Sequence, residues 1–308
     1  MIRRTEDGTA HFSGLQSCGS VWSCPVCAAK IRQHRADELD GGLGRWLDAG
    51  HGVTFVTFTL PHQWGDRLDV TFDAAEKAWR SVRNSRAWRA EMVRFGVRHY
   101  IRAIEVTVGA NGWHPHVHVL ILTRRPLDGR RVTMLGHRLF SRWAQAVRSR
   151  LGVECDRQAF RIEAGSRAAG RYVTKIQDDG AAHGLAMEMT RHDLKAGRRK
   201  GLTPMQLLDA VAAGDGDARR LWTEHERTTK GRRCLTWSRG CRDALGLDDE
   251  RTDQEIAEAE VGGELVVSLD PPTWHRIAAR PGADAAVLAS IETGGLYALG
   301  LLLIELRR

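Results

Sequence analysis

The stretch from Trp113 to Leu122 constrains the fold more than any other part of the chain, because it joins two closely spaced histidines to a β-branched, apolar tail. The tail, which begins at Val117, favours a buried strand. Side chains alternate between the two faces of a strand, so His116 and His118 project from the same side. Two imidazoles held side by side suit a divalent metal ion, although paired histidines also occur as ordinary surface or hydrogen-bonded residues.

The residues before this stretch predict its partner in a hairpin. Residues 100–108 have the composition of a strand, and a tight turn follows. With Asn111–Gly112 as the two-residue loop, Glu105 lies opposite His118; with the turn centred one residue earlier, it lies opposite His116. In both registers the carboxylate shares the histidine face. This ligand set suits Mn²⁺ or Mg²⁺ with positions open for substrate oxygen. The alternative is a satisfied polar face on a solvent-exposed sheet.

Length and composition bound the class of protein. The 308 residues suggest about two domains, and the hydrophobic content of 42% is enough for ordinary globular cores. The start lacks the apolar core of a signal peptide, and the apolar run 299–304 is too short to cross a bilayer. We therefore expect a cytoplasmic protein without a membrane partner. The net charge of +8 favours a polyanionic partner such as nucleic acid, although an arginine-rich composition also reflects a GC-rich genome.

Three cysteines, Cys18, Cys24 and Cys27, lie close together near the start of the chain. In a cytoplasmic protein this spacing indicates structural Zn²⁺ rather than a disulfide. Buried free thiols and a redox pair are the alternatives. A tetrahedral site needs a fourth ligand, and the preferred one follows the third cysteine by about two helical turns. In order of preference, the candidates for the fourth zinc ligand are His34, His11 and Cys234.

Other segments have recognisable periodicity. Residues 53–60 alternate as a strand does, with Phe55, Thr57 and Thr59 on one face. Helices are expected at about 31–46, 72–95, 133–151 and 273–303, and strands at about 158–162 and 265–269.

A further helix is expected after Gly165. Tyr172 and Lys175 are three residues apart within it and therefore share a helical face. Taken alone, such a pair is usually an amphipathic tyrosine beside a solvated lysine. The chain has only three tyrosines, which makes this one easier to single out.

The order of these motifs resembles the HUH endonucleases, and more narrowly the rolling-circle replication initiators of small actinobacterial plasmids. The resemblance extends over roughly residues 13–245. It is carried by the Cys-Pro-Val-Cys motif at 24–27, by the strand at 55–59, by His-Pro-His-Val-His-Val-Leu at 114–120 and by Tyr-Val-Thr-Lys at 172–175. The ordered set is far more specific than any one of its members.

The resemblance implies an α+β fold in which helices flank a central antiparallel sheet, with the strand at 55–59 supporting the histidine strand. Four regions are expected. Residues 1–48 form a zinc-binding segment and 49–190 the catalytic core. Residues 191–247 form a basic helical extension, and 248–308 a mixed accessory region outside the resemblance.

The resemblance also implies roles for individual residues. His116 and His118 match the metal-binding pair, with Glu105 as third ligand, and Tyr172 matches the nucleophile, with Lys175 as its cationic neighbour. The implied activity is site-specific nicking of origin DNA, in which a divalent metal polarises the phosphate. Tyrosine attack then leaves a 5′-phosphotyrosyl bond and a free 3′-hydroxyl.

Single-stranded and duplex origin DNA are the expected partners, together with a host helicase and polymerase. A single strand needs a basic groove and stacking groups. The expected DNA contacts, of which the first is alternatively an accessory metal ligand, are His114, Arg171, Arg198, Arg199, Lys200, Arg232 and Arg233.

One position departs from a related initiator branch, in which a glutamate four residues before the tyrosine activates water to end replication. Here that position is Ala168, and no second tyrosine follows within a helical turn or two. Glu163 lies nearby with different spacing and is the remaining catalytic candidate.

Four alternatives remain open at this point. An HUH transposase combines the same histidine motif with a zinc module. A non-haem iron oxygenase also uses two histidines and a carboxylate, but it needs neither the tyrosine–lysine pair nor the basic charge. An amidohydrolase begins with His-x-His, but this chain lacks a repeated βα rhythm. A zinc-dependent DNA-binding regulator would bind DNA without cleaving it.

Overall fold

A long β-hairpin organises the larger part of the molecule. The computed structural model describes residues 1–308 except 166–188, 190–200, 260–261, 281 and 307–308. In the hairpin, β4 (Val97–Gly109) pairs with β5 (Gly112–Thr123), and Gly109 lies opposite Gly112. The turn is therefore centred one residue before Asn111–Gly112, and Glu105 lies opposite His116. Of the two registers predicted for the hairpin, the second is observed.

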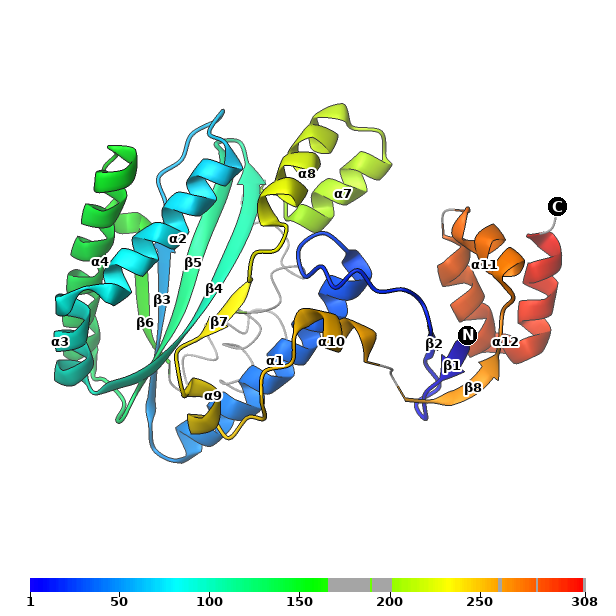
Figure 1. Ribbon diagram of the computed structural model, residues 1–308, viewed down its shortest axis with the longest axis horizontal. Helices are drawn as coiled ribbons and strands as arrows, with labels where there is room; N and C mark the ends of the chain where they lie inside the picture. The colour runs from blue at the N-terminus through cyan, green and yellow to red at the C-terminus, as the bar shows by residue number, and fades with distance from the viewer. Residues whose placement is uncertain (166–188, 190–200, 260–261, 281, 307–308) are drawn as a thin grey trace. The chain divides into compact units, whose positions relative to one another are not determined.

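The hairpin lies inside a five-stranded sheet in which every pairing is antiparallel. The strand order is β6-β3-β5-β4-β7 (Figure 1). Strand β3 (Gly52–Thr59) lies between β5 and β6 (Arg161–Gly165), and β7 (Leu235–Trp237) adds to the far edge of β4. The prediction of an antiparallel sheet in which β3 supports the histidine strand is confirmed.

Three helices, α2 (Leu68–Asn84), α3 (Arg86–Phe95) and α4 (Gly129–Leu151), lie on one side of this sheet (Figure 1). Phe58 of β3 packs there against Trp79 of α2 and Trp143 of α4, with ring centroids 5.7 and 4.9 Å apart. The single helix expected over 72–95 is two helices. Ser85 follows the last residue of α2, and its hydroxyl accepts the backbone N–H of Trp88 to begin α3.

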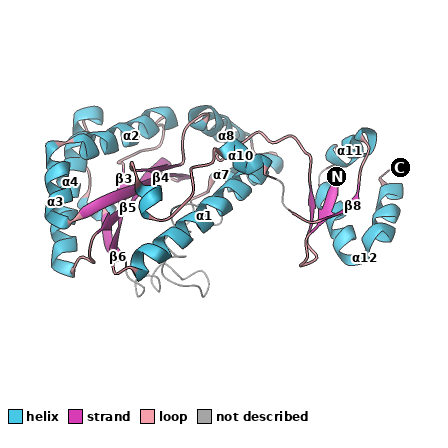
Figure 2. Ribbon diagram, turned by 60° about the horizontal axis from the view of Figure 1, so that its bottom comes forward, coloured by secondary structure: helices cyan, strands magenta, loops and turns pink. Residues whose placement is uncertain are grey.

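Helix α1 (Pro25–Asp48) covers the other face of the sheet. Its Leu39, Leu43 and Trp46 pack with Phe55 and with apolar residues of β4 and β5. The 3₁₀ turn η1 (Arg157–Ala159) precedes β6. The other helices that the structure describes in this part of the chain are α7 (Pro204–Ala212), α8 (Gly216–Thr229), α9 (Cys241–Ala244) and α10 (Asp253–Glu258). Figure 2 shows α7, α8 and α10 from a second direction.

The described chain forms two compact units, residues 19–256 and residues 1–18 with 257–308. The smaller unit has a three-stranded antiparallel sheet in the order β2-β1-β8, made of Ala10–Phe12, Ile2–Arg4 and Glu264–Val267. Helices α11 (Pro271–Ala278) and α12 (Ala283–Glu305) replace the single helix expected over 273–303. The predicted functional boundaries at residues 48, 190 and 247 stay predictions.

Helix α12 is the one described helix whose length and apolar composition would allow it to span a membrane, which differs from the expectation based on residues 299–304 alone. Its Val287, Ile291 and Leu299 are buried in the core of the smaller unit, together with Ile2 of β1. A non-helical backbone at Gly295 interrupts the helix. Only 17% of its apolar stretch is buried, and Leu296, Tyr297 and Leu301 of the same helix are exposed.

Candidate active site

Glu105 and His118 are joined directly on the face of the sheet that α1 partly covers. The Nε2 of His118 lies 2.8 Å from Oε2 of Glu105. His118 is 4% exposed and Glu105 is 7% exposed, so this polar pair is shielded from water. Glu105 lies directly opposite His116 in the pairing of β4 with β5, but its long side chain reaches the diagonal neighbour, His118. The predicted sharing of one face by the carboxylate and the two imidazoles is therefore observed.

Two threonines of β3 contact the other side of the imidazoles. Thr57 and Thr59 lie directly opposite His118 and His116. Their hydroxyl oxygens lie 3.2 and 3.1 Å from the Nδ1 atoms of these histidines. The alternation of β3 placed both threonines on one face, but only the pairing of β3 with β5 identifies their partners.

His114 extends the row of imidazoles toward the end of β5. Its ring centroid lies 4.1 Å from that of His116 and 4.2 Å from that of His62, which follows β3. Burial lowers the pKa of His114 to about 4, and the neighbouring His62 acts in the same direction, while Glu105 opposes them. His62 was missed by the sequence analysis, because nothing in its local pattern distinguishes it.

The edge strand β6 brings two more charged residues to this face. Arg161 lies opposite Thr57, and Glu163 lies opposite Phe55. Directly opposite residues share a face, so both lie on the face of His118, and both side chains are exposed. Glu163 is the predicted catalytic candidate. Nothing in the local sequence predicts that Arg161 lies beside it on this face, since that depends on the pairing of β6 with β3.

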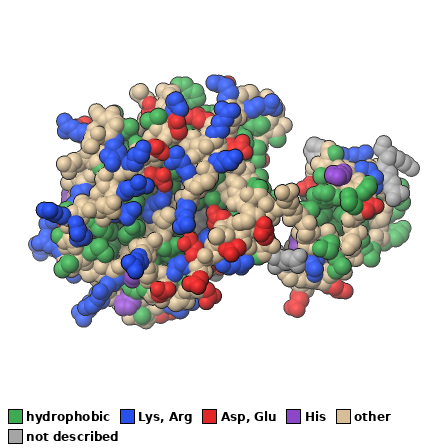
Figure 3. Space-filling model, in the orientation of Figure 1, with side chains coloured by type: hydrophobic (Ala, Val, Ile, Leu, Met, Phe, Trp, Pro, Cys, Tyr) green, Lys and Arg blue, Asp and Glu red, His purple; other side chains and the backbone are tan. Residues whose placement is uncertain are grey.

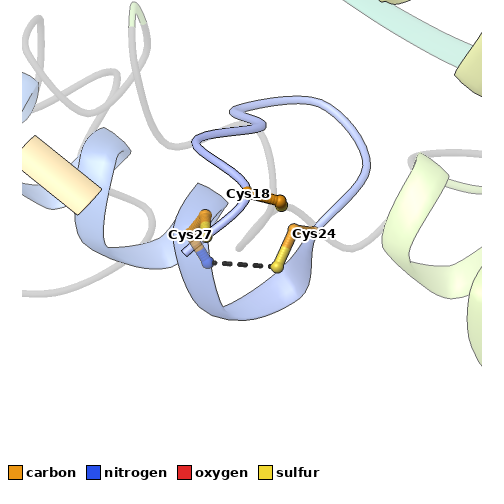
Figure 4. Close-up of side chains that lie close together, drawn as sticks. All are labelled: Cys18, Cys24 and Cys27. Carbon is orange, nitrogen blue, oxygen red and sulfur yellow. Dashed lines mark hydrogen bonds between the residues drawn. The ribbon is translucent and has the colours of Figure 1, made fainter. Parts of the chain in front are cut away.

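The three cysteines form a cluster at the beginning of α1 (Figure 4). The sulfur atoms of Cys18, Cys24 and Cys27 all lie within 4.8 Å of one another. The Sγ of Cys24 accepts the backbone N–H of Cys27 at 3.5 Å and so caps the helix. Among the described residues, these three cysteines are the group of potential metal ligands whose ligand atoms all lie this close to one another. The ligand atoms of Glu105, His116 and His118 are not all within this distance of one another.

None of the candidates for a fourth zinc ligand belongs to this cluster. His34 lies two turns further along α1, and its Nε2 is 3.5 Å from Oε1 of Glu38. Two turns correspond to a rise of roughly 10 Å, which is too far for a shared metal. His11 lies on β2, and Cys234 is buried with its Sγ 3.6 Å from the carbonyl oxygen of Ile104.

The predicted nucleophile and several predicted DNA contacts lie outside the described residues; they are Tyr172, Lys175, Arg171, Arg198, Arg199 and Lys200. The two remaining arginines differ from each other. Arg232 forms ion pairs with Asp73 and Glu76 and lies over the ring of Phe72, so part of its charge is neutralised within the protein. Arg233 is exposed.

An arginine-rich groove with a volume of about 630 Å³ lies between the beginning of α2 and helix α8. Its two carboxylates, Asp69 and Glu224, are outnumbered by the arginines. Figure 3 shows that Lys and Arg side chains are spread over the visible face of the larger unit. The basic residues of the groove are Arg67, Arg219, Arg220, Arg227 and Arg232.

The chain is similar to known replication proteins. A family described as replication protein matches residues 13–264. A Streptomyces lividans protein named "Protein rep" is 30% identical in an alignment that covers 91% of this chain and 76% of that protein. A Streptomyces cyanogenus protein named "Neomycin resistance protein" is 32% identical over 42% of this chain and 36% of its own length. No solved structure matches. Because the family match covers most of the chain, the protein belongs to the replication protein family.

Proposed function

We propose that this protein initiates plasmid rolling-circle replication by nicking one strand of the origin and remaining attached to its 5′ end. The observation that carries the proposal is the placement of Glu105, His116 and His118 on one face of the sheet, in a chain of the replication protein family. A replication protein of this kind acts on origin DNA, with a host helicase and polymerase as further proposed partners in the cytoplasm.

The chemistry of the donor set fits a divalent cation. Two imidazoles and one carboxylate leave open positions for phosphate oxygens on Mn²⁺ or Mg²⁺. When bound, such a cation stabilises the charge that develops on the scissile phosphate and the leaving oxygen. Glu105 and His118 already face each other at 2.8 Å, so a cation would take the place of the hydrogen bond between them. Burial of the pair reduces competition from water.

Tyr172 is the proposed nucleophile. Its phenolic oxygen would form a bond to phosphorus while the bond to the 3′ oxygen breaks, which gives a 5′-phosphotyrosyl bond and a free 3′-hydroxyl. Lys175 would hold the phosphate or favour the phenolate through its charge. Glu163, exposed on the face of His118, is the proposed base for the water that ends a replication cycle.

The proposed DNA contacts combine the arginines of the groove beside α8 with the basic residues expected between 191 and 200. His114 is placed at the end of the imidazole row and would contact the strand near the scissile phosphate. The three clustered cysteine sulfur atoms beside the beginning of α1 support a structural Zn²⁺ there.

Replacement of the nucleophile tests this function. With Mn²⁺ or Mg²⁺, the protein is expected to nick supercoiled or single-stranded origin DNA and to migrate with a covalently attached oligonucleotide. Tyr172→Phe should abolish both products without changing the circular dichroism spectrum, because only the phenolic oxygen is lost. Tyr297→Phe is the matched control, since Tyr297 is 79% exposed on α12 of the smaller unit.

Each outcome separates the candidates. A persisting adduct in Tyr172→Phe would reject Tyr172 as the sole nucleophile, and mass spectrometry of the adduct peptide would identify the residue used instead. Binding of origin DNA by the parent protein without any cleavage would favour a zinc-dependent regulator over a nickase.

A further inference from the structure

The two threonines of β3 have no part in the chemistry proposed above, yet each contacts one of the two histidines. Thr57 Oγ1 lies 3.2 Å from Nδ1 of His118, and Thr59 Oγ1 lies 3.1 Å from Nδ1 of His116. The same relation therefore occurs twice, two residues apart on both strands. This repetition follows from the register of β3 and β5, in which each threonine is the direct cross-strand partner of its histidine.

The geometry of a strand pair explains why the contact is to Nδ1. Directly opposite residues have their Cβ atoms about 5 Å apart. Nδ1 is bonded to the ring carbon nearest the backbone, so a short hydroxyl side chain reaches this nitrogen and not Nε2. Threonine is also β-branched, which limits the rotation of its hydroxyl away from the ring.

We propose that Thr57 and Thr59 are positioning residues. Each holds the Nδ1 atom of its histidine, His118 or His116, so that Nε2 is the nitrogen left to bind the catalytic cation. This inference rests on the proposed function, since it concerns the same site. A histidine that binds a metal through Nε2 holds its other nitrogen in a hydrogen bond, which fixes the ring orientation and the tautomer. The Nε2 of His118 already points toward Glu105, its proposed co-ligand.

A hydroxyl suits this task because it both donates and accepts a hydrogen bond. In the tautomer in which His118 Nε2 donates to Glu105, the hydroxyl of Thr57 would donate to Nδ1. With a cation held by Nε2, the proton would reside on Nδ1 and the same hydroxyl would accept it. The threonine therefore keeps its bond in both states.

The ring of Phe55 stacks on His118 at 5.5 Å between centroids, with an angle of 8° between the planes. Phe55 belongs to the same strand and the same face as the two threonines. Stacking limits tilting of the imidazole, and the hydrogen bond limits its rotation. Together these contacts hold the nitrogen that binds the cation in one place.

The test measures Mn²⁺ binding in the absence of DNA, by calorimetry and by electron paramagnetic resonance. The double variant Thr57→Val/Thr59→Val keeps the β-branched shape and removes both hydroxyls. We expect its Mn²⁺ affinity to fall by about 10- to 100-fold. Thr57→Ser/Thr59→Ser keeps both hydroxyls and should bind within about threefold of the parent, a rescue that a purely structural role of the methyl groups would not give.

Thr54→Val is the matched control. Thr54 lies on the same strand and is buried, but its position is on the opposite face. The Thr54→Val variant should therefore bind Mn²⁺ with the same affinity as the parent protein. The ¹⁵N shifts of the imidazole nitrogens provide a second measurement, because loss of the hydroxyls should mix the tautomers of His116 and His118.

The outcomes distinguish this inference from the function on which it rests. If the valine variants bind Mn²⁺ as tightly as the parent and keep the same imidazole shifts, the positioning role is wrong while the nickase remains. If the parent protein binds no Mn²⁺, or if His118→Ala binds Mn²⁺ as tightly as the parent, the proposed metal site is wrong and the inference fails with it. The proposed function is measured separately, by the nicking of origin DNA by the parent protein.

Discussion

His225 of α8 is a fully buried histidine outside the candidate active site. Three tryptophans surround its ring, with centroids 5.6 to 6.2 Å away, and neither ring nitrogen has a hydrogen-bond partner among the described residues. Burial lowers the pKa of His225 to about 4, and the charge of Arg32 acts in the same direction. The folded protein therefore stabilises the neutral imidazole. The three aromatic residues are Trp22, Trp113 and Trp222.

This burial predicts an acid-sensitive core in the larger unit. The unfolded chain protonates a histidine near pH 6.5, whereas the folded chain protonates His225 only near pH 4. Between these values the unfolded state binds more protons, so stability falls as the pH falls, by about 3 kcal/mol over the whole interval. Urea unfolding followed by tryptophan fluorescence at pH 7 and 4.5 measures this loss. His225→Phe should show a smaller loss; the same loss in parent and variant would exclude His225 as its source.

At the scale of elements, the beginning of α1 combines helix capping with the cysteine cluster. Cys24 occupies the N-cap, Pro25 is the first helical residue, and Cys27 is buried in the first turn. Proline at this position loses no helical hydrogen bond. The same helix packs its later residues against the sheet that carries the histidines. A metal bound to the cysteines would therefore fix one end of a helix that partly covers the face of the candidate active site.

Metal analysis tests this site. We expect about one equivalent of zinc per chain, because three cysteine sulfur atoms within 4.8 Å of one another can all bind one tetrahedral Zn²⁺. Cys24→Ser and Cys27→Ser should each lower the zinc content. Cys155→Ser is the matched control: Cys155 lies outside the cluster, and burial raises its pKa to about 11. Equal zinc content in all three variants would remove the assignment.

At the scale of the whole molecule, the net charge of +8 includes a local excess of positive charge in one groove. The groove between α2 and α8 holds five arginines and two carboxylates. Part of this charge is used inside the protein, as the pairing of Arg232 with Asp73 shows. Arg219 and Arg227 are the groove residues on α8 for which a phosphate contact is expected.

The salt dependence of DNA binding measures this contribution. Each phosphate neutralised by an arginine adds about 0.9 to the slope of log affinity against log salt concentration. Arg219→Gln/Arg227→Gln should therefore lower the magnitude of the slope by up to about two, with weaker binding to every sequence. Arg148→Gln on α4 is the control, because Arg148 is exposed and paired with Glu154. An unchanged slope in the double variant would place the DNA elsewhere.

Much of the fold was predictable from short-range patterns. Alternation along β3 and the β-branched, apolar tail of β5 predicted these two strands, and the turn after β4 predicted the hairpin, because these features depend on neighbouring residues alone. Helix breaks were less predictable. Ser85 and Gly282 each separate two helices whose apolar spacing looks continuous, and the break depends on local capping and on a positive φ at Gly282.

The sequence by itself determined that Glu105, His116 and His118 share a face, because a strand alternates with a period of two in either register of the turn. It also determined the family, through the order of its motifs. The separation of His34 from Cys27 also follows from helical rise once both residues are placed in one helix. Only the tertiary structure decided that Thr57 and Thr59 contact the histidines, because that contact depends on the pairing of β3 with β5, two strands far apart in the sequence.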